Sequence, residues 1–350
     1  MTKKAEFKLF ANCIIVRGAT RSTVCDLQRN DVHFIPNAFA DLMQERSLCE
    51  CDDFDEETAA CIKYLVENDL GHFVTDPDQF PELSLEYTNP GTLSHAIIEL
   101  SDQPAFDVAK ALHSLSDAGV KFVDFWIRHK MDRTLLETLV RNLKPTRILT
   151  VNICMPFAEG WTSPIFEYLF VSFQRLYSIT LYGANIEKVE NILGRQVIHT
   201  KGILDARQCG KIHTHCFSCN IKTFSESQHF NTCLNGKITI TSEGLVKNCP
   251  AMQETFGRID APLNEVVSNK GFQRFWNIKK DDINICRDCE FRHVCTDCRA
   301  FLETPEDIYS RPLKCGYDPY TGEWKSWSTH PQKKYSISYY GLEAVVESDK

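Results

Sequence analysis

Cysteine is the residue that most constrains how this chain can fold. The 350-residue sequence contains 16 cysteines, and ten of them lie between Cys209 and Cys315. In a protein of a reducing compartment, a dense block of cysteines indicates bound metal. In a secreted protein, the same block indicates disulfides. No apolar run approaches the roughly 20 residues of a membrane helix, and the first residues lack the apolar core of a signal peptide. We therefore predict a cytoplasmic, metal-binding protein.

The spacing of the later cysteines indicates iron–sulfur clusters. Cys233 and Cys249 flank a stretch that contains Gly244. A Cys-x2-Cys-x5-Cys-x2-Cys run and one more cysteine follow, at Cys286, Cys289, Cys295, Cys298 and Cys315. A four-iron cluster takes four thiolates, so these seven cysteines and one more predict two clusters. Zinc, held in a knuckle or treble clef, is the alternative.

The turn around Gly244 predicts a β-hairpin between residues 238–240 and 245–246, which would bring Cys233 and Cys249 together. The early cysteines show no ligand spacing, and we expect buried or incidental thiols at Cys13, Cys25, Cys49, Cys51 and Cys61. His213 and His215 precede Cys216. We interpret them as loop histidines, with a metal site as the alternative.

The hydrophobic pattern predicts an α/β fold with several parts. Residues 1–75 have strands followed by helices, including a helix over 38–45 capped by Asn37, and are typical of a winged-helix-like module. Residues 92–205 alternate strands with helices, which predicts βαβ units and a partial βα barrel or open sheet. Residues 206–332 form the cysteine-rich part. The tail over 333–350 is predicted to hold a strand at 335–340.

Charge excludes two kinds of partner. The formal net charge is −8, and the isoelectric point is near 5.8. An acidic surface is repelled by nucleic acid and by anionic membranes. We therefore expect no nucleic-acid partner and no membrane partner.

The cysteine pattern resembles the SPASM domain of peptide-maturing radical SAM enzymes. The residues around these cysteines are similar in sequence to one subgroup of this family, the SPASM maturases of grasp-with-spasm peptide systems. The similarity lies in residues 7–13, 230–235, 247–250, 286–292 and 298–301, and in residues 315–320. The last close pair departs from the family, because Cys295 and Cys298 are separated by two residues where three are usual.

The resemblance implies how the cysteines divide between two [4Fe–4S] clusters. One cluster would be held by Cys286, Cys289, Cys295 and Cys315. The other would be held by Cys233, Cys249 and Cys298 with an upstream cysteine. Cys219, which is the nearest upstream cysteine, is favoured over Cys209 and Cys216, and an open iron site is a further possibility.

One expected motif is absent. Radical SAM enzymes carry Cys-x3-Cys-x2-Cys after the first barrel strand, but residues 101–106, which follow the strand predicted at 96–100, contain no cysteine. The chain therefore resembles a degenerate radical SAM scaffold that kept its SPASM domain, and we expect no cleavage of S-adenosylmethionine. Glu99 and Asp124 lie on predicted strands and could line a cavity, but neither is assigned a catalytic role.

The resemblance implies work on a ribosomally made peptide (RiPP). The expected partners are a precursor peptide, docked on residues 1–75 as on a RiPP recognition element, and an ATP-grasp ligase. Whether the chain is itself an enzyme stays open at this point. A non-catalytic adaptor with structural clusters and a zinc-binding interaction protein are the alternatives.

Overall fold

The computed structural model describes residues 4–50 and 53–348, so Cys51 lies outside the described residues. The chain divides into two compact units. Unit 1 comprises the described parts of residues 1–87, 210–233 and 277–350, and unit 2 comprises residues 88–209 and 234–276. Each unit is described by itself.

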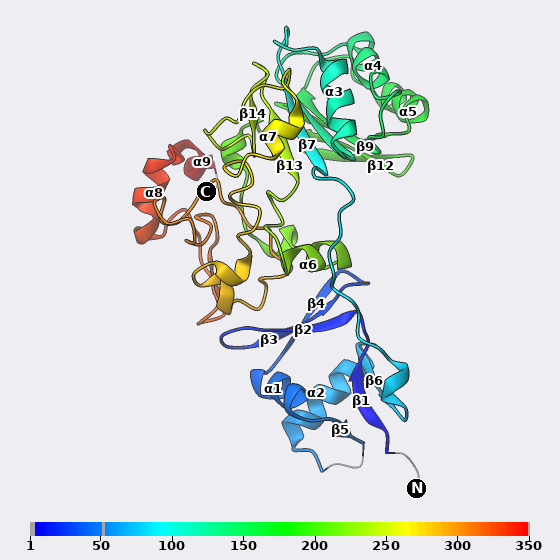
Figure 1. Ribbon diagram of the computed structural model, residues 1–350, viewed down its shortest axis with the longest axis vertical. Coiled ribbons are helices and arrows are strands. Elements are labelled where there is room, and N and C mark those ends of the chain that lie inside the picture. The colour runs from blue at the N-terminus through cyan, green and yellow to red at the C-terminus, as the bar shows by residue number, and fades with distance from the viewer. Residues whose placement is uncertain (1–3, 51–52, 349–350) are drawn as a thin grey trace. The chain divides into compact units, whose positions relative to one another are not determined.

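Unit 2 is built on an eight-stranded sheet with the order β11-β12-β10-β9-β8-β7-β13-β14 (Figure 1). The six inner strands are parallel, and the edge strands β11 and β14 pair antiparallel with their neighbours. The strands are β7 (His95–Leu100), β8 (Phe122–Ile127), β9 (Thr150–Pro156), β10 (Leu176–Tyr182), β11 (Lys188–Ile192), β12 (Arg195–Thr200), β13 (Lys237–Ile240) and β14 (Val246–Lys247). The helices are α3 (Val108–Asp117), α4 (Arg133–Arg141), α5 (Ser163–Ser172) and α7 (Leu263–Val267).

The predicted βαβ alternation is confirmed, and this mostly parallel sheet fits a partial α/β barrel. Alternation along β9 shows why the sheet forms, since Val151, Ile153 and Met155 are buried while the residues between them are half-exposed. Such a pattern buries one face of each strand in an apolar core. The predicted hairpin is also confirmed, because β13 pairs with β14 and Gly244 has a φ of 79°.

Unit 1 contains two small antiparallel sheets, with the orders β5-β1-β6 and β2-β3-β4, and a two-stranded ribbon. Its strands are β1 (Glu6–Leu9), β2 (Cys13–Arg17), β3 (Ser22–Asp26), β4 (Asp31–Ile35), β5 (Leu48–Cys49), β6 (Gly71–Val74), β15 (Tyr317–Asp318) and β16 (Glu323–Trp324). Its helices are α1 (Asn37–Glu45), α2 (Glu56–Glu67), α6 (Ile221–Ser227), α8 (Lys334–Tyr339) and α9 (Glu343–Ser348). The predicted order of strands before helices is confirmed; the winged-helix classification and the domain boundaries stay predictions.

Two sequence predictions in unit 1 are wrong. Asn37 is not the N-cap of α1, because Pro36 holds that position. The side-chain Nδ2 of Asn37 instead donates to the carbonyls of Gly18 and Ala19. Residues 335–340 are not a strand, because α8 covers most of them. Residues 335 and 339 are exposed and their rings contact each other at a tilted angle, at the i,i+4 spacing of a helix, while residues 336 and 337 are buried.

The N-terminal strands pack directly on the cysteine-rich segment of unit 1. The amide of Ala19 donates to the carbonyl of Asp288 at 2.7 Å, and Arg21 Nε donates to Glu290 Oε1 at 2.8 Å. A side chain at Gly18 would lie 2.8 Å from Glu290 Cβ. Only glycine fits at this contact, which joins the β2–β3 turn to residues 288–290. Within the described residues, no helix combines the length and apolar character needed to cross a bilayer.

Candidate metal centre

Four of the predicted ligands come together in unit 1. The charges of Cys286, Cys289, Cys295 and Cys315 influence one another, and each thiol lies within electrostatic range of at least two of the others. The short 3-10 turn Cys286–Asp288 places the first two, since the amide of Cys289 donates to the carbonyl of Cys286 at 3.0 Å. These four thiols thus lie in one region of unit 1, and their assignment to one cluster stays a prediction.

Burial favours the protonated form of three of these thiols. It raises the pKa of Cys286 and of Cys289, and it raises the pKa of Cys295 to about 12. A buried thiol is protonated at neutral pH, and it becomes a thiolate ligand only when positive charge or metal compensates it. The site therefore depends on its surroundings for charge balance.

The backbone before the first ligand is unusual. Ile285 has a φ of 68°, a left-handed conformation that is rare for a β-branched residue. Such strain persists only where the surrounding structure imposes it, and it is concentrated at functional sites. The strain turns the chain immediately before Cys286. Sequence reasoning missed it, because no glycine marks the position.

A buried lysine contacts this group of thiols. Lys280 Nζ lies 3.9 Å from Cys286 Sγ and 3.4 Å from Asp297 Oδ1. Burial disfavours its charge, yet negative charge on Cys286, Cys295 and Asp297 raises the pKa of Lys280 well above its usual value. The ammonium group is therefore held in its charged form beside sulfur.

The wider surroundings of the four thiols carry excess positive charge. Asp297 pairs with both Lys280 and Arg299, and Glu303 pairs with both Arg311 and Lys333. Each of these two carboxylates is thus shared by two cations, and all six side chains are largely shielded from water. Uncompensated buried cations are costly. An anionic group among the thiols would balance them, as a four-thiolate cluster with net negative charge does.

The donor set of this group consists of four thiols. Among the described residues, no three His, Cys, Asp or Glu side chains are placed to hold one metal ion. Zinc draws its thiolates to about 2.3 Å from one centre, whereas in a four-iron cluster each cysteine binds a different iron, so the sulfurs lie farther apart. Four thiolates suit a four-iron cluster or a four-cysteine zinc site, so the choice of iron–sulfur over zinc stays a prediction.

The cysteines of the second predicted ligand set are divided between the two units. Cys298 and Cys233 belong to unit 1, whereas Cys249 belongs to unit 2, so the convergence of these three stays a prediction. Within unit 1, a Cβ added at Gly210 would lie 2.7 Å from Cys298 Sγ. Gly210, with a φ of 79°, thus lets the chain approach this sulfur closely.

Cys219 is engaged elsewhere in unit 1. Its thiol donates to the carbonyl of Asp31 at 3.0 Å and forms a hydrogen bond with Cys25. Its amide donates to Asn30 Oδ1 at 2.7 Å. Cys25 and Cys219 are both buried. Cys209 and Cys216, the other upstream candidates, are exposed.

Buried polar atoms without partners flank the second ligand set. Three such atoms belong to residues next to the predicted ligands: Thr232 Oγ1, Asn248 Oδ1 and Arg299 Nε, beside Cys233, Cys249 and Cys298. Buried polar atoms are nearly always satisfied by protein, water or a bound group.

A row of polar side chains, which sequence reasoning did not foresee, crosses the sheet of unit 2. His95 Nε2 contacts Asp124 Oδ2, Asn152 donates to Asp124 Oδ1, and Ser178 donates to Asn152, each at 2.8 Å. Burial opposes ionisation, but the hydrogen bonds from His95 and Asn152 and the charges of His95 and Lys237 lower the pKa of Asp124. The row therefore holds an ionised carboxylate. Glu99 instead pairs with Arg128 at 3.1 Å.

Comparison with known proteins does not identify the family of this chain. No family model matches the chain, and no curated protein matches it. The crystal structure of Streptococcus suis SuiB bound to S-adenosylmethionine is similar with a TM-score of 0.40 and 9% identity, covering 87% of this chain and 98% of that chain. A second SuiB crystal structure gives 0.36 and 10%, with the same coverage. A TM-score below 0.5 does not establish a common fold.

Proposed function

We propose that this chain is an iron–sulfur protein of ribosomal peptide maturation, working in a reducing cytoplasm. The observation that carries the proposal is the group formed by Cys286, Cys289, Cys295 and Cys315 among buried cations. These four thiols would hold one [4Fe–4S] cluster. Bound there, with each iron ligated by a cysteine, a cluster supplies one-electron transfer.

The second cluster would be held by Cys233, Cys249, Cys298 and one upstream cysteine. Cys219, favoured by its nearness in sequence, has its thiol bonded to Cys25 and to the Asp31 carbonyl. Cys209 directly precedes Gly210, which packs on Cys298 Sγ. Cys209 and Cys216 are the other upstream candidates for the fourth ligand.

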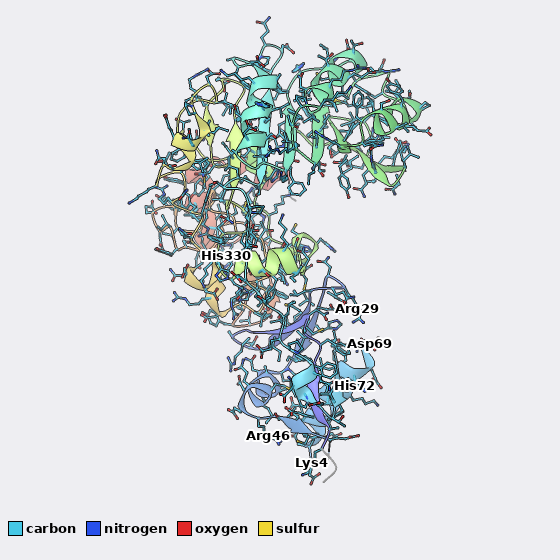
Figure 2. All side chains as sticks on the ribbon, turned by 45° about the vertical axis from the view of Figure 1, so that its right-hand side comes forward. Lys4, Arg29, Arg46, Asp69, His72 and His330 are labelled. Carbon is cyan, nitrogen blue, oxygen red and sulfur yellow. The ribbon has the colours of Figure 1, made fainter. Side chains whose placement is uncertain are left out.

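A groove in unit 1 supports the proposed peptide partner. Strand β1 pairs with β6 over four residues but with β5 only at Glu6 and Phe7. Beyond them, Lys8 and Leu9 line a groove of about 550 Å³. Arg46, labelled in Figure 2, lines the same groove. An extended precursor peptide would continue the ladder of β5 along β1, by strand addition.

The precursor peptide and an ATP-grasp ligase are the partners that the resemblance implies, and both belong to the proposal. Without the Cys-x3-Cys-x2-Cys motif, no cleavage of S-adenosylmethionine is proposed. The alternative is a non-catalytic adaptor that presents the peptide to the ligase, with clusters that only stabilise the fold. The missing motif favours that alternative, whereas an open iron site would favour catalysis.

Anaerobic purification with iron and sulfide counts tests the proposal. Two four-iron clusters require about eight irons and eight sulfides per chain, and Mössbauer spectra identify the cluster type. Zinc without sulfide would refute the proposal. We expect no 5′-deoxyadenosine when S-adenosylmethionine is added under reducing conditions.

A further inference from the structure

A buried chain of polar contacts links the two predicted ligand sets inside unit 1. It begins at Cys286 Sγ, which lies 3.9 Å from Lys280 Nζ. Lys280 Nζ lies 3.4 Å from Asp297 Oδ1, and Asn231 Nδ2 donates to Asp297 Oδ2 at 2.6 Å. Asn231 Oδ1 in turn accepts from the amide of Cys233 at 3.0 Å.

This chain of contacts is shielded from solvent. Lys280 has a side-chain exposure of 6% and Asp297 of 1%. Asn231 is buried, and Arg299 donates to Asp297 Oδ1 at 2.6 Å. In such surroundings the effective dielectric constant is low, so a fixed charge acts strongly on its neighbours.

We propose that Lys280 sets the reduction potential of the cluster at Cys286, Cys289, Cys295 and Cys315, and that Asp297 positions Lys280 for this role. This inference rests on the proposed function. Reduction adds one negative charge to the cluster and its thiolates. An ammonium group that donates to a ligand sulfur stabilises that charge, so it raises the potential.

Lys280 is distinguished from the other cations by what it touches. Its ammonium group faces a ligand sulfur. Lys333 donates to the main-chain oxygens of Leu313 and Cys315, and Arg299 donates to the carbonyls of Ile308 and Ser310. Those two cations hold the loops in place, whereas Lys280 acts on the group that accepts the electron.

The test compares two neighbouring lysines in the full-length chain. Lys280→Met removes the buried charge, and Lys279→Met removes a charge from a side chain that is 35% exposed and donates to the carbonyl of Gln228. Potentials are measured anaerobically by titration with dithionite, which is oxidised to sulfite as each cluster takes up one electron. Electron paramagnetic resonance follows the reduced cluster. We expect a more negative potential for Lys280→Met and the wild-type potential for Lys279→Met.

The outcomes separate this inference from the proposed function. Wild-type protein without iron and sulfide would refute the proposed function itself. A loaded wild-type protein with an unchanged potential in Lys280→Met would overturn the inference alone. If the Lys280→Met variant does not retain its cluster, the Lys280→Arg variant serves as the test of the inference. A loaded Arg variant near the wild-type potential supports a role for the charge, and a folded Arg variant that holds no cluster contradicts it.

Discussion

A single thiol tests the assignment of ligands at the residue scale. Cys289 lies within electrostatic range of Cys286 and Cys295, and a serine there would remove one of the four thiolates of a cluster. We expect Cys289→Ser to lower the iron content from about eight to about four per chain. Cys154→Ser is the matched control, since Cys154 lies on β9 beside Asp124 and is not a predicted ligand. Equal iron in both variants would contradict the assignment.

A second residue-scale prediction concerns pH and Cys13. Burial, aided by the charge of Asp26, raises the pKa of Cys13 from 9.0 to about 12. Because the unfolded chain loses this proton first, the stabilising effect is complete below pH 9 and is lost as the pH rises toward 12. Between pH 8 and pH 10, we expect the free energy of unfolding to fall by up to about 1.4 kcal/mol more in wild type than in Cys13→Ala. Urea unfolding followed by circular dichroism measures the free energy of unfolding at each pH. The same pH dependence in wild type and in Cys13→Ala would disprove the prediction.

At the element scale, helix α8 follows Lys333, which contacts the main chain of the predicted ligand Cys315. Lys333, which is 1% exposed, donates to the carbonyls of Leu313 and Cys315 and pairs with Glu303. Lys333→Met would leave these buried acceptors without a donor, which costs about 1–3 kcal/mol for each unsatisfied group. We expect iron to be removed by a chelator several-fold faster. Lys334→Met, at an exposed position, serves as the control, and equal rates would count against the prediction.

Elements with a strong periodic pattern could be predicted from sequence. Strands β7 to β10 and helices α3 to α5 lie where alternating apolar segments indicated them. The place of β13 beside β7 could not be predicted, because pairing between segments some 140 residues apart leaves no local signal. The tyrosines Tyr335, Tyr339 and Tyr340 have high β propensity and therefore predict a strand. Packing in the folded protein overrides this propensity, and the segment is helical.

At the scale of the whole molecule, unit 1 draws on three separate stretches of the chain. Spacing alone indicated the four thiols, because ligands close in sequence leave a recognisable motif. The cations around them leave no such motif. Lys280 lies in a run of charged residues over 279–282 that looks like a solvated surface, yet it is buried against sulfur. The charge balance of the site therefore becomes visible only in three dimensions.

The two units differ in their regular structure. Unit 2 has a sheet with an apolar buried face. Residues 277–333 of unit 1 contain only short 3-10 turns and two-residue strands, although Phe291, Val294 and Tyr317 pack in an apolar cluster with residues of β2 and β3. Under the proposed function, bound metal would supply much of the remaining stability of this segment. We therefore expect chelation of iron to unfold it while the sheet persists.

Hydrogen exchange with mass spectrometry, before and after anaerobic chelation, measures this difference directly. Amides over residues 277–333 should exchange at least tenfold faster in the apoprotein, because removing the cluster leaves buried thiols and excess cations without compensation. Amides of β7 to β10 serve as the internal control and should keep their protection, since their apolar core contains no predicted ligand. Equal protection of residues 277–333 in both states would mean that packing alone holds the segment. The cysteines would then be dispensable for its fold.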